Sequence, residues 1–551
     1  MKIEKLTNVK LKTGESESVL YEKARRVLKG KPGYFKILKK SLDARDKNNI
    51  FYVYSIEFSL TAPNISETPL ETLKRQDRPS AERPVLIAGS GPAGLFCALR
   101  LLKRGITPVL IERGERVEDR EKTLARFHRT GTLNTESNVS FGEGGAGTFS
   151  DGKLNTGTHV KENDEVLREF TRFGAPEEIL YLNKPHIGSD KLKSVVKNMR
   201  EYLIKNGAKV YFGAKLTDLY VKDGVLQAAE IEFSEERAAS ANGAAQTAET
   251  AETAATAETA ASQCGRAGKS RQKIEVSALV LAIGHSARDT FETLRFRGVA
   301  MQKKDFAVGV RIEHLQNAVG FSQYGEAYKR LPPADYKCVF HGDRAAFTFC
   351  MCPGGYVMAA ASEAEGVVTN GMSNYARDGV NCNSALIVQV TSADYPQENP
   401  LAGVEYQRGI ERAAYAAGGG KYVAPVQRVE DFLRGKESCR FGEVLPTYPR
   451  GTAFADLSSV LPAPVSEELK RAVIGMDSRL KGFACPDALL TAAETRTSSP
   501  VRIVRGEDMQ SVTCKRLFPC GEGAGYAGGI TSSAADGIRV ADAVFASLRN
   551  S

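Results

Sequence analysis

The sequence predicts an α/β protein that is divided into more than one domain. With 551 residues, the chain is too long for a single hydrophobic core. The stretch VLIAGSGPAGLFCALR, from Val85, runs from apolar residues through closely spaced glycines into an amphipathic segment. This order is typical of a buried strand, a tight turn and a helix. Strand-like runs recur downstream and leave room for a second sheet.

The composition is that of an ordinary globular protein, with 42% hydrophobic and 26% charged residues. No apolar run approaches the length of a membrane span, and the first residues lack the apolar core of a secretory signal. The ten cysteines are scattered without a C-x-x-C pair, which favours a reducing compartment and argues against a thioredoxin-type exchanger. We therefore expect a cytoplasmic protein. The six histidines lack zinc spacing, so we predict no metal.

Residues 1–60 predict a small basic α/β module. A helix is expected over 20–28, and strands are expected over 34–38 and 50–60. Residues 1–50 hold 14 Lys+Arg and 6 Asp+Glu, or +8, within a net charge of +9. Such a surface could meet nucleic acid, a membrane surface or an acidic partner, or could simply be solvated. The polar, proline-bearing segment 61–84 predicts a linker.

The first glycine cluster predicts a Rossmann-like dinucleotide site. Gly89 allows the tight turn, Gly91 lets the backbone approach a pyrophosphate, and Gly94 lets helix and strand pack closely. The helix over 95–103 offers its N-terminus to phosphates. Glu112 ends the next strand, where a carboxylate can accept from ribose hydroxyls. The same spacing recurs at 142–147 and 523–528, but without this context.

An alanine-rich segment interrupts the first domain at residues 238–272. Of the 25 residues from 238 to 262, 12 are Ala and 5 are Thr, and none is large and apolar. Such a segment cannot bury a core face, so we predict a disordered surface insertion. Its flanks, VLQAAEIEF and KIEVSALVLAIG, look like strands of one sheet.

Several motifs together resemble one family. GSGPAG with IERG, ALVLAIGHSARD and LFPCGEGAGYAGGITSSAADGIRVADA resemble the glutathione-reductase-type FAD flavoproteins. More narrowly, SNVSFGEGGAGTFSDGKLNT, KPHIGSDKL, FTFCMCPGGYV, TNGMS and ETRTSSPVRI resemble the bacterial uncharacterised FAD-dependent, or NAD(FAD)-utilising, dehydrogenases. The resemblance implies non-covalent FAD and a Rossmann-like FAD-binding domain with three layers (ββα), joined to a mixed-sheet substrate domain.

The resemblance also implies which residues bind FAD. Glycine-rich backbone would pass close to the ring system and the diphosphate, and the last helix would point its N-terminus at the flavin. Glu522 stands where many relatives of the wider superfamily have Asp. The predicted FAD-binding residues are Gly89, Gly91, Pro92, Ala93, Gly94, Glu112, Arg113, Gly114, Gly142, Gly144, Gly145, Ala146, Gly147, Thr148, Asp151, Lys153, Gly284, Gly521, Glu522, Gly528, Gly529 and Ile530.

The expected domains follow from these segments. The FAD-binding domain takes residues 85–290 and 501–551, and a substrate or cap domain takes 291–500. Strand-like pieces at 306–314, 345–352 and 384–392 predict a mixed or antiparallel sheet over the flavin. This region shows no second βαβ unit for a nicotinamide cofactor, so NAD(P)H would bind only transiently as an electron donor.

Catalytic side chains are only weakly indicated. Arg311 and Arg496 could clamp a carboxylate substrate, or form structural ion pairs. Cys352, with Cys350, could be a redox pair or half of a metal site, or could pack in the core. His186 and His285 could shuttle protons or be structural.

The sequence therefore predicts a FAD-dependent oxidoreductase that transfers a hydride between an unidentified small-molecule substrate and the N5 atom of the flavin. Two alternatives stay open at this point. One is a flavin-dependent hydroxylase, and the other is an RNA-associated flavoprotein that docks through the basic N-terminal module.

Overall fold

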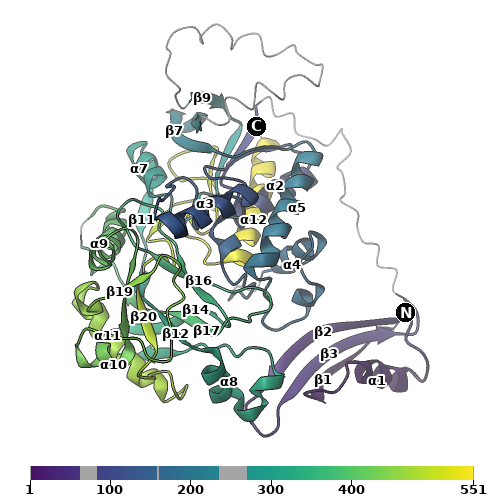
Figure 1. Cartoon of the computed structure of the whole chain (residues 1–551). Helices are drawn as coiled ribbons and strands as arrows, with labels where there is room; N and C mark the ends of the chain where they lie inside the picture. Colours follow the sequence, from purple (N-terminus) through teal and green to yellow (C-terminus); the bar gives the residue numbers. More distant parts are fainter. Residues whose placement is uncertain (1, 63–82, 158–159, 235–269, 397, 550–551) are drawn as a thin grey trace.

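The computed structural model describes residues 2–62, 83–157, 160–234, 270–396 and 398–549, shown in Figure 1. Within these residues, the first domain is built on a five-stranded sheet in the order β22-β10-β4-β5-β6. All neighbours pair in parallel. The strands are β4 (Val85–Ala88), β5 (Val109–Ile111), β6 (Lys209–Tyr211), β10 (Ala278–Leu281) and β22 (Leu517–Pro519).

Helices cover one face of this sheet, and a second sheet covers the other. Val85 and Ile87 share an apolar cluster with the helices, whereas Leu86 and Ala88 share another with the antiparallel sheet β7-β8-β9 and α7. The alternation buries both faces of β4, which explains its uninterrupted apolar run. The elements are α2 (Pro92–Lys103), α3 (Val117–Thr130), α4 (Glu162–Arg172), α5 (Ser189–Lys205), α12 (Ile530–Arg549), β7 (Ala214–Lys222), β8 (Val225–Phe233), β9 (Ser270–Glu275) and α7 (Arg288–Phe296).

This arrangement confirms the predicted fold class of three layers, ββα. One local prediction is wrong, because the run 273–284 is not one strand. Val276 N still bonds to β8 at the Gln227 carbonyl, but Ser277 N bonds to the Pro84 carbonyl, before β4. The chain therefore crosses from the antiparallel sheet to the parallel one between β9 and β10. Helix α2 also starts earlier than expected, because Pro92 suits its first turn.

A mixed sheet forms the second domain. Its described strands lie in the order β13-β14-β17-β12-β20-β18-β19, and only β18 and β19 pair in parallel. The three predicted strands correspond to β12, β14 and β17, which confirms the expected mixed sheet. The bounds are β12 (Phe306–Leu315), β13 (Val339–His341), β14 (Ala345–Cys352), β17 (Asn381–Val390), β18 (Ala424–Arg428), β19 (Thr452–Phe454) and β20 (Leu489–Glu494).

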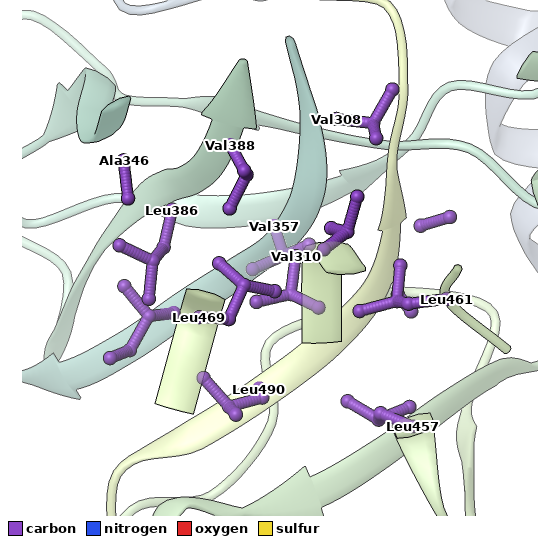
Figure 2. Packing of buried hydrophobic residues seen from close by; sticks show 14 of the residues in the cluster. Val308, Val310, Ala346, Val357, Leu386, Val388, Leu457, Leu461, Leu469 and Leu490 are labelled. Carbon is purple, nitrogen blue, oxygen red and sulfur yellow. The ribbon is translucent and has the colours of Figure 1, made fainter. Parts of the chain in front are cut away.

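The core of this domain lies on one face of the mixed sheet. Figure 2 shows Val308 and Val310 from β12 with Leu386 and Val388 from β17, packed near Leu469 of α11. The other face carries the buried Arg311 beside a small apolar cluster of Ala307, Ala385 and Ile387. Smaller elements complete the domain: α8 (Gln316–Tyr324), β15 (Tyr356–Ala359), β16 (Thr369–Met372), α9 (Ala402–Ala417), α10 (Val429–Arg434) and α11 (Ala463–Asp477), with β11 (Met301–Lys303) and β21 (Val501–Ile503) joining the two domains.

The N-terminal module is a three-stranded sheet in the order β1-β3-β2, with α1 packed on one face (Figure 1). Its elements are β1 (Glu4–Lys12), α1 (Ser18–Leu28), β2 (Tyr34–Asp43) and β3 (Phe51–Ser59). Strand β1 lacks a clear apolar alternation and was not expected from the sequence. The module meets the first domain where Lys40 pairs with the segment around Leu182. What partner the module binds stays a prediction.

Two predicted segments fall mostly outside the described residues. These are 63–82 of the linker and 238–269 of the insertion. The last three residues of the predicted insertion, 270–272, belong instead to strand β9, which pairs with β8. Among the helices of the described ranges, none combines the length and apolar character needed to cross a bilayer.

Candidate functional site

One cavity of about 480 Å³ lies between the parallel sheet of the first domain and the mixed sheet of the second domain, which is called the cap sheet below. Segments far apart in the sequence converge on it, as the resemblance predicted. The predicted residues that line it are Gly89, Gly91, Pro92, Ala93, Glu112, Arg113, Gly145, Ala146, Gly147, Lys153, Gly284, Glu522, Gly528, Gly529, Ile530 and Arg496. Those outside the lining are Gly94, Gly114, Gly142, Gly144, Thr148, Asp151, Gly521, Arg311 and Cys352.

The glycine turn after β4 combines tight packing with an open edge. A Cβ on Gly89, whose φ is +104°, would lie 2.2 Å from the Ala282 oxygen, and a Cβ on Gly94 would lie 1.9 Å from the Gly89 oxygen. Gly91 faces the cavity instead, and the nearest atom to its Cβ position is 3.8 Å away. The N-terminus of α2 therefore points backbone N–H groups and a positive dipole end at the cavity.

Glu112 ties this turn to the second glycine cluster. Its carboxylate accepts from the Ser90 N–H and hydroxyl, both at 2.9 Å, and from the Gly114 and Gly142 N–H groups, both at 3.0 Å. These four bonds use about all the acceptor sites of a carboxylate. Glu112 lines the cavity, but its first role is to fix two loops; the predicted ribose contact stays a prediction.

A buried arginine that the sequence did not indicate supports the second glycine cluster. Arg120 of α3 is fully buried and donates to the carbonyl oxygens of Asn138, Val139, Glu143 and Gly145. Its guanidinium binds these four carbonyl oxygens on the buried side of the glycine loop. The backbone of residues 145–147 therefore lies on the cavity side. The sequence alone could not indicate this role, because the carbonyl partners of an arginine in the helix 117–130 are set by the tertiary fold.

Asp151 does not face the cavity. Its buried carboxylate forms an ion pair with Arg377, through hydrogen bonds to both carboxylate oxygens, and Lys153 lies 3.6 Å away. Thr148 is likewise buried and donates to the Glu143 carbonyl. The prediction of direct polar contacts to the cofactor is therefore wrong for these two residues, while Lys153 lines the cavity.

The start of α12 forms another part of the cavity wall. Ile530 begins this helix, and no atom lies within 4 Å of a Cβ built on Gly528 or Gly529. Both glycines line the cavity, so N–H groups and the positive end of a helix dipole face it. Gly521 lies deeper and donates its N–H to Asp536.

Two titratable side chains, Glu522 and His285, lie next to each other in the cavity wall. Glu522 Oε1 lies 3.6 Å from His285 Nδ1. Burial raises the pKa of Glu522 to about 7, against the lowering effect of Lys304. Burial and the nearby Arg496 and Arg288 lower the pKa of His285 to about 4. At neutral pH the imidazole is uncharged, and the carboxyl is close to its own pKa.

Both candidate arginines are held in ion pairs. Arg311 bonds to both carboxylate oxygens of Glu494, and also to Cys350, Asn370 and Asn383. These bonds occupy its whole guanidinium. The clamp prediction is therefore wrong for Arg311.

Arg496 lines the cavity, but its guanidinium bonds to both carboxylate oxygens of Glu411 and to Ser362. Arg288 of α7 also bonds to both oxygens of Glu411. This cluster joins the cap helix α9 to the first domain. The alternative of a structural ion pair therefore applies to both arginines, while a substrate contact by Arg496, which lines the cavity, stays a prediction. His186 bonds to the Tyr375 carbonyl and does not line the cavity.

The comparisons with known proteins agree with this geometry. Residues 82–140 match the family described as FAD binding domain, and residues 305–497 match FAD-dependent protein, C-terminal domain-like. Residues 3–59 match a domain of unknown function. An uncharacterized protein of Clostridium beijerinckii is 41% identical over 561 residues, covering 98% of each chain. The chain belongs to the family of this clostridial protein. It is a FAD-dependent oxidoreductase.

Solved structures similar to this oxidoreductase include the flavin-dependent brominase Bmp2, at 12% identity and TM-score 0.36, which covers 85% of this chain and 80% of that one. CtdE in complex with FAD is similar at 11% identity and TM-score 0.32, over 85% and 88% of the two chains.

The residues of the oxidoreductase fit FAD. Gly91, Gly528 and Gly529 leave space where side chains would enter the cavity, and helices α2 and α12 point their N-termini into it. The cavity is continuous from Glu112 to the cap strand β14. A long, partly anionic dinucleotide needs such an extended site with backbone N–H donors along it.

Proposed function

We propose that the chain is a dehydrogenase or reductase of the glutathione-reductase type, which moves a hydride between a small-molecule substrate and the N5 atom of non-covalent FAD. The observation that carries the proposal is the single cavity shared by the Gly91 turn, the Gly528 turn and the cap sheet. NAD(P)H serves as a transient electron donor in this proposal, and the cytoplasm is the proposed location.

Named segments would hold the cofactor. The N–H groups at the start of α2, with Gly91 and Ala93, suit the pyrophosphate, and the end of β5 at Glu112 and Arg113 suits the adenosine ribose. Gly529 and Ile530 at the start of α12 suit the flavin, because a positive helix end stabilises negative charge on a reduced ring. Bound FAD supplies the hydride acceptor or donor of the reaction.

The chain contributes a cavity between its two domains and a group that can accept a proton. The cap strand β14 and the β20 residue Glu494 line the cavity. With a pKa near 7, the Glu522 carboxylate can accept a proton near neutral pH, whereas His285, with a pKa of about 4, stays neutral beside it. Substrate oxidation at a C–H bond next to an O–H or N–H group needs such an acceptor.

Visible spectroscopy of the purified protein tests this proposal. We expect a yellow protein with a flavin spectrum, from which denaturation releases the flavin. We also expect anaerobic bleaching of that spectrum by NADH or NADPH, or by one member of a panel of carboxylic and unsaturated acids. A folded protein that stays colourless after incubation with FAD contradicts the proposal. Rapid oxygen consumption with stoichiometric oxygenation of a product would instead support a hydroxylase.

A further inference from the structure

One stretch of the cavity wall is formed where two segments of the first domain run side by side. Lys153 pairs with His186 in an antiparallel bridge, and the Leu154 N–H donates to the Pro185 carbonyl at 3.0 Å. The next residue of the second segment is Lys184, and both Lys153 and Lys184 line the cavity. Two lysines that are far apart in the sequence therefore belong to the same part of the wall.

The cap sheet contributes another lysine and an aromatic ring. Strands β13 and β14 pair antiparallel, and just before β13 the Cys338 carbonyl accepts from the Thr348 N–H at 2.9 Å. The same register places Lys337 opposite Phe349, and opposite residues of an antiparallel pair are neighbours. Both line the cavity, and Phe349 is 39% exposed although its side chain is large and apolar.

An ion pair joins these two parts of the wall. Lys184 Nζ lies 2.7 Å from Asp335 Oδ1, and Asp335 lines the cavity two residues before Lys337. Because Lys184 and Lys337 are exposed, this part of the wall lies where the cavity opens to solvent. The rim, as it is called below, consists of Lys153, Lys184, Asp335, Lys337 and Phe349.

Two ammonium groups of the rim lack an acid of their own. Lys337 forms no ion pair with any residue that the structure describes. Lys153 Nζ lies 3.6 Å from Asp151, but both carboxylate oxygens of Asp151 already accept hydrogen bonds from Arg377. The only acid within the rim, Asp335, is paired with Lys184. The rim therefore carries a net positive charge.

The other acids of the cavity lining do not cancel this charge. Both carboxylate oxygens of Glu494 accept from Arg311. Glu112 lies beside the turn before α2, where its oxygens accept from backbone N–H groups and a hydroxyl. Burial raises the pKa of Glu522 to about 7, so this carboxyl is only partly ionised at neutral pH. The opening of the cavity therefore attracts anions.

We propose that the rim binds the anionic end of the substrate, and that the substrate is an organic anion with a planar, apolar body. Its carboxylate or phosphate lies against Lys337 and Lys153, and its body lies against the ring of Phe349. The proposal deepens the proposed function by naming the substrate class, and it rests on that function for the chemistry at the flavin.

The lysines and the ring together favour molecules that have both parts. A flat apolar body packs on an aromatic face, and an oxyanion accepts hydrogen bonds from ammonium groups. A neutral molecule of the same shape gains only the contact with Phe349. Two sources carry this chemistry: an aromatic or unsaturated carboxylic acid, and NAD(P)H, which joins a flat ring to phosphates.

Binding of cinnamate to the full-length protein tests the proposal, with the neutral cinnamamide as the matched ligand. Isothermal titration calorimetry gives the dissociation constant of each. We expect cinnamate to bind several-fold more tightly than cinnamamide, and we expect this advantage to shrink as the salt concentration rises. Equal affinity for the two ligands, or binding of neither, overturns the proposal.

Three substitutions separate charge from shape. Lys337→Gln should weaken the binding of cinnamate several-fold and leave that of cinnamamide unchanged, whereas Lys337→Arg should retain both. Phe349→Ala should weaken the binding of both ligands. Lys481→Gln is the control, because Lys481 is an exposed lysine of the same domain outside the cavity lining. Equal effects of K337Q and K481Q on cinnamate contradict the role of Lys337.

Anaerobic bleaching of the flavin by NADPH distinguishes the two sources of the anion. If the rim binds the dinucleotide, cinnamate should slow the bleaching, and K337Q should need more NADPH to reach half of the maximal rate. If the rim binds a separate acid, neither should change the bleaching, while the affinity for cinnamate still depends on Lys337. Either result supports the rim as an anion site.

The colour of the same samples distinguishes the two ways of failing. A yellow protein that binds cinnamate no better than cinnamamide overturns the anion site and leaves the proposed function standing. A colourless protein whose affinity for cinnamate depends on Lys337 contradicts the proposed function, while the anion site stands.

Discussion

At the scale of single residues, the cavity holds groups whose protonation depends on the fold. Glu522 has an ordinary pKa of 4.5 and a folded value of about 7, because burial penalises its charged form. The folded protein therefore binds this proton more tightly than the unfolded chain does. The resulting stability is fully present below about pH 4.5 and is lost as pH rises through 7.

Substitution of Glu522 tests that dependence. Because glutamine does not titrate, Glu522→Gln should gain thermal stability relative to the wild type as pH rises from about 5 to about 8. Differential scanning calorimetry at both values measures the difference in Tm. The exposed Glu437 provides the control substitution Glu437→Gln, which removes one carboxylate outside the cavity. If the difference in Tm between E522Q and the wild type did not change with pH, the Glu522 carboxyl of the wild type would have an ordinary pKa.

At the scale of elements, the close contact of α2 with the turn before it positions the cavity end of the helix. Gly94 should tolerate no side chain, since a Cβ there would lie 1.9 Å from the Gly89 oxygen. Gly94→Ala should therefore cost about 1–3 kcal/mol and weaken FAD binding.

Gly409 in α9 is the matched control, because no atom lies within 4 Å of its Cβ position. Gly409→Ala should leave binding unchanged and stabilise the fold by about 0.5–1 kcal/mol. Thermal unfolding and FAD titration measure both variants. Equal effects at the two positions would contradict the packing argument.

Elements with local signals could be predicted from the sequence, and contacts between distant residues could not. Strand β4, its glycine turn and α2 follow from 16 consecutive residues, because apolar period and glycine spacing are local. The ion pair of Asp151 with Arg377 joins positions 226 apart, so Asp151 looked like a cofactor ligand. The run 273–284 gave no sign of the crossing between two sheets at Val276, since the crossing depends on the pairing of β9 with β8 and of β10 with β4, which are distant in the sequence.

At the scale of the whole molecule, the N-terminal module stands apart from the cavity. It has its own apolar cluster, which includes Leu20 and Ile56. Its described contacts with the rest include bonds from Lys40 to the segment at 181–183 and from Lys47 to Ser322. The residues lining the cavity begin at Ala88.

Removal of residues 1–82 should therefore leave FAD binding unchanged. The flavin absorbance per protein and the dissociation constant for FAD, compared between truncated and full-length protein, measure this. A soluble, folded truncation that has lost its flavin would show that the module supports the cofactor site from a distance.

The pairing of β8 with β9 determines how easily the connection between these two strands can change in length. Phe233 and Ser270 are paired across neighbouring strands, so the 36 residues between them start and finish at adjacent points. Each doubling of such a connection costs only about 0.6 kcal/mol of closure entropy. Mutation can lengthen or trim this connection cheaply, and an engineer could splice a fluorescent reporter into it.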